Sequence, residues 1–174
     1  MTATAHDVII AELPALLPRL WRYGLVLSRD PVTAEDLVQA TCVRALERSS
    51  QFTVGTRLDR WLFSILRSIW INQVRAQRIR TGQGLVDPEE VLVTDGVQQI
   101  EMNIFAGQVF KQVQALPEAQ RETVLLVYVE GLTYQEVASV LNVPPGTVMS
   151  RLAAARLKLR GLQESSTGEG NQEN

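Results

Sequence analysis

The stretch that most constrains the fold is residues 131–160, which read GLTYQEVASVLNVPPGTVMSRLAAARLKLR. Thr133 is followed three residues later by Glu136, the spacing of a capping box, which predicts that a helix begins there. Asn142 and a Pro-Pro pair then interrupt the helical pattern, and Pro145 suits the first turn of a following helix, where its missing N–H costs nothing. Two short helices joined by a tight turn predict a helix-turn-helix, a motif that reads duplex DNA.

The second of these helices has two unlike faces when its residues are placed at roughly 100° intervals. One face is apolar and is expected to be buried: Val148, Leu152, Ala155 and Leu159. The opposite face carries Ser150, Ala153 and Ala154, between basic flanks formed by Arg151, Lys158, Arg156 and Arg160. Small side chains permit close approach to a major groove, and the basic residues suit the phosphates on either side. The alternative is a packing unit with a solvated basic face, but no acidic residue occurs between positions 142 and 162.

Charge is strongly segregated along the chain, although the formal net charge is only −2. Residues 57–80 carry a net +5 and residues 142–162 a net +4, whereas residues 81–141 carry −7. Two basic patches separated by an acidic span predict two nucleic-acid contacts in one molecule.

Apolar residues recur at helical spacing in residues 13–21, 34–46 and 61–74, and no strand-like alternation competes with this pattern. A turn-rich, acidic interval begins at Thr81. We therefore predict an all-α fold of two small helical domains, residues 1–80 and 108–162, the second a helix-turn-helix domain. A flexible acidic linker, residues 81–107, is expected to join them, and the polar residues 163–174 are expected to be a disordered tail.

Enzymatic and metal-binding functions find little support in the composition. Cys42 is the only cysteine, which excludes an intramolecular disulfide and favours a buried thiol, and His6 is the only histidine. We therefore expect no catalytic residue, no metal site and no cofactor. The early apolar segment lacks the pattern of a signal peptide, and nothing approaches the roughly 20 apolar residues of a membrane span. The sequence predicts a cytoplasmic protein without membrane insertion.

Four segments together resemble bacterial sigma factors of the extracytoplasmic-function (ECF) type in the sigma-70 family, which retain only conserved regions two and four. The first half of the resemblance rests on AEDLVQATCVRAL (34–46) and FTVGTRLDRWLFSILRSIWINQVR (52–75). The second half rests on LPEAQRETVLLVYVEGLTYQEVASVLNV (116–143) and GTVMSRLAAAR (146–156). Their order makes the resemblance specific, and it extends from about residue 10 to residue 162.

This resemblance implies a factor that binds core RNA polymerase and promoter DNA and performs no chemistry of its own. Region four would read the −35 element through Thr147, Met149, Ser150, Arg151, Ala153, Ala154 and Arg156. Polymerase docking would use the polar positions left once Leu37 and its neighbours are buried: Glu35, Asp36, Gln39 and Arg44. An ordinary solvated helix face would give the same pattern. An inhibitory anti-sigma factor is a further partner that the resemblance implies.

Region two would read and help melt the −10 element through the loop Gln51–Leu58 and the helix after it. The residues assigned to this contact are Thr53, Gly55, Thr56, Arg57, Asn72 and Arg75. A flexible backbone and short hydrogen-bonding side chains suit the capture of a base that has left the stack, whereas a plain helix connection is the alternative. Trp61 is expected to be core, because Leu62, Ile65 and Ile69 share its neighbourhood.

Three positions depart from many relatives, which carry Asn at Ser68 and basic residues at Met149 and Ala154. The promoter preference therefore cannot be copied from other members, although Met149 and the alanines could meet thymine methyl groups. Two phrases, VPPGTVMSRL and GTRLDRWLFSIL, resemble the proteobacterial general-stress subgroup.

Two other classes of protein remain open. An autonomous helix-turn-helix regulator would need a dimerisation surface or effector pocket, for which the chain shows no obvious segment. A helical adaptor that binds only protein would leave both basic patches unexplained.

Overall fold

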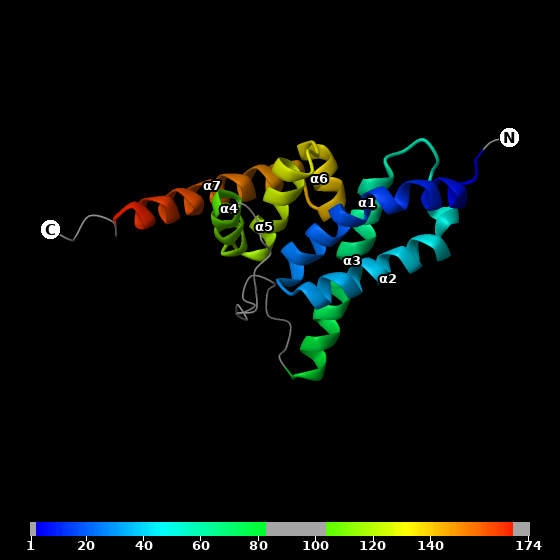
Figure 1. The fold of residues 1–174 in the computed structure, drawn as a ribbon, viewed down its shortest axis with the longest axis horizontal. Coiled ribbons are helices and arrows are strands. Elements are labelled where there is room, and N and C mark those ends of the chain that lie inside the picture. Colours follow the sequence, from blue (N-terminus) through cyan, green and yellow to red (C-terminus); the bar gives the residue numbers. More distant parts are fainter. Residues whose placement is uncertain (1–2, 83–103, 169–174) are drawn as a thin grey trace.

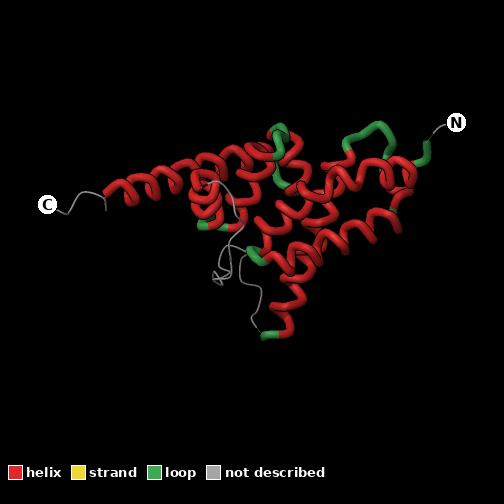
Figure 2. The backbone as a smooth tube through the Cα atoms, viewed as in Figure 1, coloured by secondary structure: helices red, strands yellow, loops and turns green. Residues whose placement is uncertain are grey.

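The computed structural model describes residues 3–82 and 104–168. The first range holds α1 (Ala5–Ser28), α2 (Pro31–Glu47), the 3-10 turn η1 (Ser49–Gln51) and α3 (Leu58–Arg80). The second holds α4 (Ile104–Gln114), α5 (Glu118–Val124), the π-helical turn η3 (Leu125–Val129), α6 (Tyr134–Leu141) and α7 (Pro145–Gly168). These residues form helices and loops without any strand (Figure 2), so the predicted all-α class is confirmed.

Residues 3–82, here called the N-terminal unit, form a three-helix arrangement of α1, α2 and α3. Asp30 caps α2 by accepting from the Thr33 N–H at 2.8 Å, and Pro31 occupies the first turn, where proline is favoured. Gly24 lets α1 and α2 approach closely, because a Cβ there would lie 3.3 Å from the Ala34 Cα. The apolar core of this unit includes Leu20, Leu37, Leu62, Phe63 and Leu66.

Residues 104–168, here called the C-terminal unit, contain the predicted helix-turn-helix in α6 and α7. Thr133 and Glu136 form the predicted capping box, with the Glu136 N–H donating to Thr133 Oγ1 at 3.2 Å and the Thr133 N–H donating to Glu136 Oε2 at 2.9 Å. Asn142 ends α6 in the left-handed region, at φ 54°, and Pro145 begins α7. The predicted inner face of α7 is confirmed: Val148, Leu152 and Ala155 are buried, and Leu159 packs against the core.

The element boundaries differ from the predicted domain boundaries in two places. Helix α4 begins at Ile104, inside the predicted linker 81–107, and residues 83–103 lie outside the described residues. Helix α7 continues to Gly168, six residues into the segment predicted to be disordered. Adding a residue to an existing helix costs far less than starting one, and the sequence after Leu162 contains no proline to stop it. The predicted disorder of residues 169–174 falls outside the described residues.

The two units are packed against each other, with α5 beside α1 and α6 beside α3 (Figure 1). Their buried apolar side chains form one continuous cluster, which includes Leu66 and Phe63 from the N-terminal unit and Leu126 and Leu116 from the C-terminal unit. The two helical units therefore share one apolar core.

Candidate nucleic-acid interface

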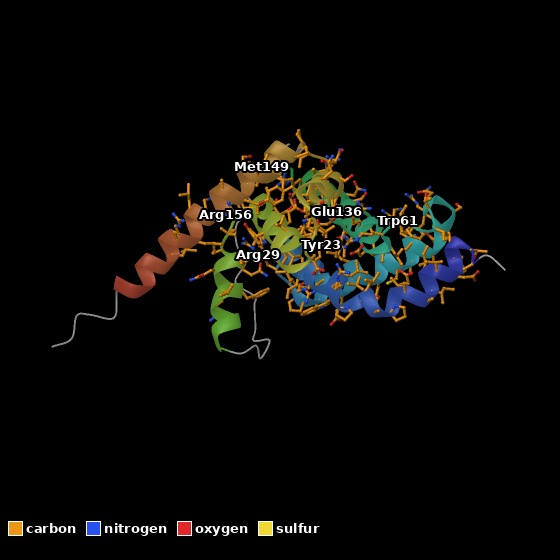
Figure 3. All side chains as sticks on the ribbon, turned by 90° about the horizontal axis from the view of Figure 1, so that it is seen from above. Tyr23, Arg29, Trp61, Glu136, Met149 and Arg156 are labelled. Atoms are coloured by element: carbon orange, nitrogen blue, oxygen red, sulfur yellow. The ribbon has the colours of Figure 1, made fainter. Side chains whose placement is uncertain are left out.

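Helix α7 carries the residues predicted to meet duplex DNA on the side opposite its buried face. Met149 is 53% exposed, and Ser150, Ala153 and Arg156 are also exposed. Thr147, Arg151 and Ala154 are half-buried at the edges of this surface. Figure 3 shows Met149 and Arg156 on α7, well away from Trp61 in the N-terminal unit. Ser150 and Ala153 are small and exposed on this surface, whereas Ala154, predicted to lie beside them, is half-buried at its margin. Contact of this surface with DNA stays a prediction.

Arg156 is held by a tyrosine that sequence reasoning missed. Its Nη2 and Nε donate to Tyr128 Oη at 2.5 and 3.1 Å, and its guanidinium carbon lies 5.9 Å from the centre of that ring. Hydrogen bonds to Tyr128 and then Tyr134 raise the pKa of Arg156 above its ordinary value. Tyr128 comes from η3, 28 residues earlier, so no local sequence signal pairs the two residues. The cation is thereby given a fixed position beside the outward surface of α7.

The loop before α3 forms a compact exposed turn. The Thr56 N–H and hydroxyl both donate to the Thr53 carbonyl, at 3.1 and 2.7 Å. Gly55 has φ +90° and no atom within 4 Å of an added Cβ. A positive φ at the third position of a turn is the place where glycine is favoured. Thr53, Gly55 and Thr56 are therefore presented together at the surface.

Of the other three residues predicted to contact the −10 element, one lies beside this turn and two lie further along α3. Arg57 follows the turn directly, but it donates to Asp59 at 2.7 Å and to Glu136 at 3.2 Å. Asn72 and Arg75 are exposed on α3. At about 1.5 Å per residue, Asn72 lies roughly 22 Å along the helix from Arg57. Any strand that contacts the turn and these two residues must therefore run along α3.

Trp61 is half-buried and packs against the core, as predicted, with its ring centre 5.3 Å from that of Phe52. Cys42 is also half-buried, and this burial raises the pKa of its thiol. The tryptophan therefore packs on Phe52 at the base of the loop.

Helix α2 presents the residues predicted to dock on polymerase. Glu35, Asp36 and Gln39 are exposed, and Arg44 is half-buried. Two valines that sequence reasoning missed, Val32 and Val43, extend this surface and are 67% and 55% exposed. Positions 32, 36, 39 and 43 follow the spacing of three and four residues that places side chains on one helix face. This face, called the α2 face below, is polar in its centre and apolar at both ends.

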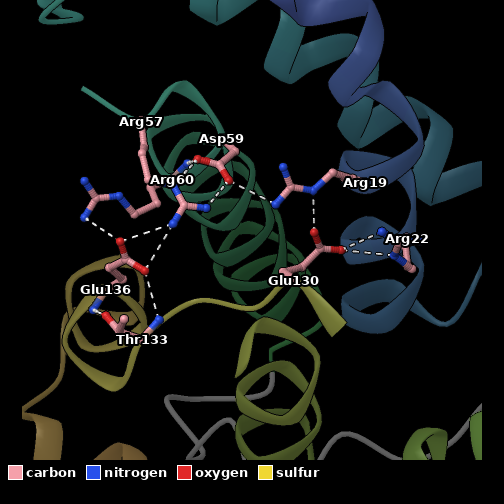
Figure 4. A network of polar contacts seen from close by, with 8 residues as sticks. All are labelled: Arg19, Arg22, Arg57, Asp59, Arg60, Glu130, Thr133 and Glu136. Carbon is pink, nitrogen blue, oxygen red and sulfur yellow. Dashed lines mark hydrogen bonds and ion pairs between the residues drawn. The ribbon is translucent and has the colours of Figure 1, made fainter. Parts of the chain in front are cut away.

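Ion pairs between the units occupy several arginines of the N-terminal unit (Figure 4). Glu130 accepts from Arg19 at 2.5 Å and from Arg22 at 2.9 Å, and its side chain is 1% exposed. Glu136 accepts from Arg57 at 3.2 Å and lies 3.7 Å from Arg60. The Coulombic pull of these two arginines adds to the hydrogen bond from the Thr133 backbone in lowering the pKa of Glu136.

A second, deeper group of polar contacts lies between α1, α3 and α5. Glu122 accepts from Arg67 at 3.1 Å and from the Tyr23 hydroxyl at 3.1 Å. Burial next to Glu122 raises the pKa of Tyr23 well above its usual value. Glu118 accepts from the Trp70 indole at 3.2 Å, and burial raises the pKa of that carboxyl.

Arg121 of α5 is a buried cation that lies against the end of α1. It donates to the carbonyls of Val26, Leu27 (3.3 Å) and Leu116 (2.9 Å), and the first two belong to the last turn of α1. Burial, together with repulsion from Arg29, lowers the pKa of Arg121 to about 10. A cation suits the negative end of a helix dipole, so the C-terminal unit supplies a basic residue that the last turn of α1 does not contain itself.

Within residues 3–82 and 104–168, none of the helices combines the length and hydropathy that a membrane span requires. The same residues contain no cluster of three or more His, Cys, Asp or Glu side chains placed to hold a metal ion.

A helix-turn-helix with an open outward surface, joined to a helical unit with an exposed loop and an arginine-rich helix, defines a DNA-binding transcription protein. Residues 14–79 match the family Sigma-70 region 2, and residues 107–159 match Sigma-70, region 4. The ECF RNA polymerase sigma factor EcfG of Rhodopseudomonas palustris is 32% identical over 93% of this chain and 86% of its own. SigC of Mycobacterium tuberculosis, also an ECF RNA polymerase sigma factor, is 33% identical over 90% of this chain and 92% of its own.

The structure is similar to that of the sigma factor RpoE from Bartonella quintana, solved in complex with the anti-sigma factor NepR. The TM-score is 0.71 at 27% identity, and the similarity covers 91% of this chain and 98% of the other. The chain belongs to the ECF type of the sigma-70 family.

Proposed function

We propose that this chain binds core RNA polymerase and directs it to promoters, reading the −35 element with α7 and the −10 element with the turn at Thr53–Thr56. The observation that carries this proposal is the presence, in one chain of this family, of an open outward surface on α7 and an exposed turn on region two. The chain is an initiation factor and not an enzyme, and its site of action is the cytoplasm.

The −35 contact follows from the side chains of α7. Ser150 and Ala153 permit a close approach to base edges, and the exposed Met149 offers an apolar contact to thymine methyl groups. Arg156, positioned by Tyr128, suits a phosphate at the edge of the groove. With few basic groups on this helix, binding to the −35 element depends strongly on attachment to polymerase.

The −10 contact follows from the turn and from α3. The exposed Gly55 backbone and the short side chains beside it suit a base that has left the stack during melting. Asn72 and Arg75, further along α3, suit the backbone of the strand that is displaced. The α2 face contacts core polymerase, its polar centre providing hydrogen bonds and its valines providing apolar contact.

An anti-sigma factor is a proposed protein partner. This follows from the similarity of the whole chain to a sigma factor that was solved with such a partner. The complex would be detected as co-purification of a second protein with the tagged chain, with loss of transcription when the two are mixed.

Run-off transcription with core polymerase on a library of random promoters tests the function directly. We expect initiation at a shared sequence pattern that is absent without the chain. An autonomous regulator would instead bind its operator tightly as an isolated chain, with no effect of polymerase on the choice of start site, and that result would overturn the proposal.

The assignment of the −10 turn is tested separately by replacing Thr53, Gly55 and Thr56 with alanine. We expect fewer permanganate-reactive thymines in the melted region, while polymerase association stays near that of the wild type. Equal loss of both activities would show that the turn acts in folding or docking.

A further inference from the structure

We propose that Val54 is a wedge, an apolar side chain that fills the gap left in the base stack when a base of the −10 element leaves it. This inference rests on the proposed function and deepens it, because it names the group of the turn at Thr53–Thr56 that helps to open the duplex. Val54 is not among the residues that the sequence predicted to contact DNA, although both of its neighbours are.

Val54 is an exposed apolar residue at the tip of the loop between η1 and α3. It is 47% exposed, and the loop stands out from the helices at the edge of the molecule (Figure 2). Single exposed valines are common on protein surfaces. The role of Val54 therefore depends on how the turn holds it and on what the turn meets.

The loop that carries Val54 is anchored in the core at both ends. Phe52 before the turn is 5% exposed, and Leu58 after it is 3% exposed. The Phe52 ring also packs against Trp61. The turn between these anchors is therefore short, and its tip has a defined position relative to α3.

Hydrogen bonding within the turn uses its polar groups and leaves the valine outward. Val54 and Gly55 are its second and third residues, and Gly55 has the positive φ that the third position of such a turn requires. The Thr56 hydroxyl donates to the Thr53 carbonyl at 2.7 Å. A β-branched side chain also has few rotamers. The methyl groups of Val54 are therefore presented in a restricted geometry and lose little conformational entropy on binding.

The chemistry of valine suits the face of a base pair and not the edge of a base. Its side chain has neither a donor nor an acceptor, so it cannot read a Watson–Crick edge, whereas the Thr53 hydroxyl and the Gly55 backbone can. Proteins that distort a duplex insert apolar side chains between base steps, where they replace contacts that unstacking removes. Valine is shorter than the leucine or phenylalanine of many such wedges. Val54 is therefore expected to cover the exposed face of the last intact base pair.

This placement couples two events at one turn. The groups beside Val54 capture the base that leaves the stack, and Val54 covers the gap that the base leaves behind. A contact of this kind stabilises the opening of paired DNA. It adds little to the binding of DNA whose bases are already unstacked.

The test compares Val54→Ala with the wild type as holoenzymes on two forms of one promoter from the run-off selection. One form is fully paired, and the other carries mismatches across the −10 element, so that its bases are already unstacked. The matched control is Val109→Ala, which makes the same truncation at a position of α4 that is 45% exposed. The fluorescence of 2-aminopurine in the −10 element follows opening.

We expect Val54→Ala to open the paired promoter about five- to tenfold more slowly than the wild type, because the unstacked step stays uncovered. It should bind the mismatched promoter like the wild type. Val54→Leu, whose longer apolar side chain covers the same gap, should open the paired promoter at least as fast as the wild type. Val109→Ala should match the wild type on both templates.

Two results would overturn the inference. Equal rates for Val54→Ala and the wild type on the paired promoter would show that Val54 takes no part in opening. An equal loss on the paired and mismatched promoters would show that Val54 contacts the captured base or supports the fold. Failure of the proposed function is a separate result, because the wild type itself would then leave the paired promoter closed in the presence of core polymerase.

Discussion

Replacing Gly24 with alanine should destabilise the chain, although alanine is normally the better helix former. Gly24 lies in α1 where α2 crosses it, and an added Cβ would lie 3.3 Å from both the Cα and the carbonyl oxygen of Ala34 and 3.4 Å from its Cβ. Two of these three atoms belong to the backbone and cannot rotate away. Helices α1 and α2 must therefore move apart to accept the methyl group.

The expected magnitude follows from two opposing effects. Glycine to alanine within a helix stabilises by up to about 1 kcal/mol, whereas overpacking a tight contact costs about 1–3 kcal/mol. A net loss of about 0–2 kcal/mol is expected for Gly24→Ala. Gly161 provides the matched control, because it is also helical and an added Cβ meets no atom within 4 Å. Gly161→Ala should therefore stabilise by about 0.5–1 kcal/mol.

Thermal unfolding of the two variants and the wild type checks this prediction. For a chain of this length each kcal/mol shifts Tm by about 2–4 °C, so the two alanine variants should differ by several degrees, in opposite directions from the wild type. Equal stabilisation by both substitutions would refute the reasoning, since it would show that α1 and α2 can accommodate the methyl group at no cost.

Three further results are expected. Thr133→Ala should lower the free energy of unfolding by about 1 kcal/mol, because it removes the cap of α6, while Thr133→Ser should retain it; urea titration compares them. Tyr128→Phe should weaken binding of the holoenzyme to a −35-containing promoter a few-fold, with an unchanged salt slope, because Arg156 keeps its charge and loses its fixed position; binding equal to the wild type would contradict this. Burial would raise the pKa of Asp59, but hydrogen bonds from Arg57 and Arg19 outweigh it and hold that pKa below its ordinary value. The stabilisation that the ionised Asp59 contributes is therefore complete above about pH 4 and is lost as the pH falls through the pKa of Asp59 in the folded chain. In a plot of the free energy of unfolding against pH, the fall at acid pH should therefore be shallower for Asp59→Asn than for the wild type.

The helix-turn-helix could be predicted closely because its determinants are local. Thr133 and Glu136 are three residues apart, and Asn142 and Pro145 mark the end of one helix and the start of the next. The 3.6-residue period then separates the buried Val148 from the exposed surface of α7. Each of these features depends on neighbours within one or two helical turns, so the sequence pattern carries it directly.

The packing between the units could not be predicted, because it joins residues that are far apart in the sequence. Arg19 and Glu130 are 111 positions apart, and Arg67 and Glu122 are 55 apart. Hydrophobic periodicity also places an arginine at the surface by default, yet Arg121 is 2% exposed. Its burial depends on carbonyls at the end of α1, which lie beside Arg121 only once both units have folded and packed together.

The segregation of charge therefore has a physical consequence in this chain. Residues 57–80 carry +5 and residues 81–141 carry −7, and in the packed state carboxylates from the second segment, Glu122 and Glu136, pair with arginines of the first. The pairs that Glu136 makes with Arg57 and Arg60 are partly exposed, so each contributes about 0–1 kcal/mol and weakens with salt. An interface held partly by such pairs weakens as the salt concentration rises, whereas a wholly apolar interface does not. The acidic span therefore makes part of the contact between the two units sensitive to ionic strength, while the apolar cluster that they share is not.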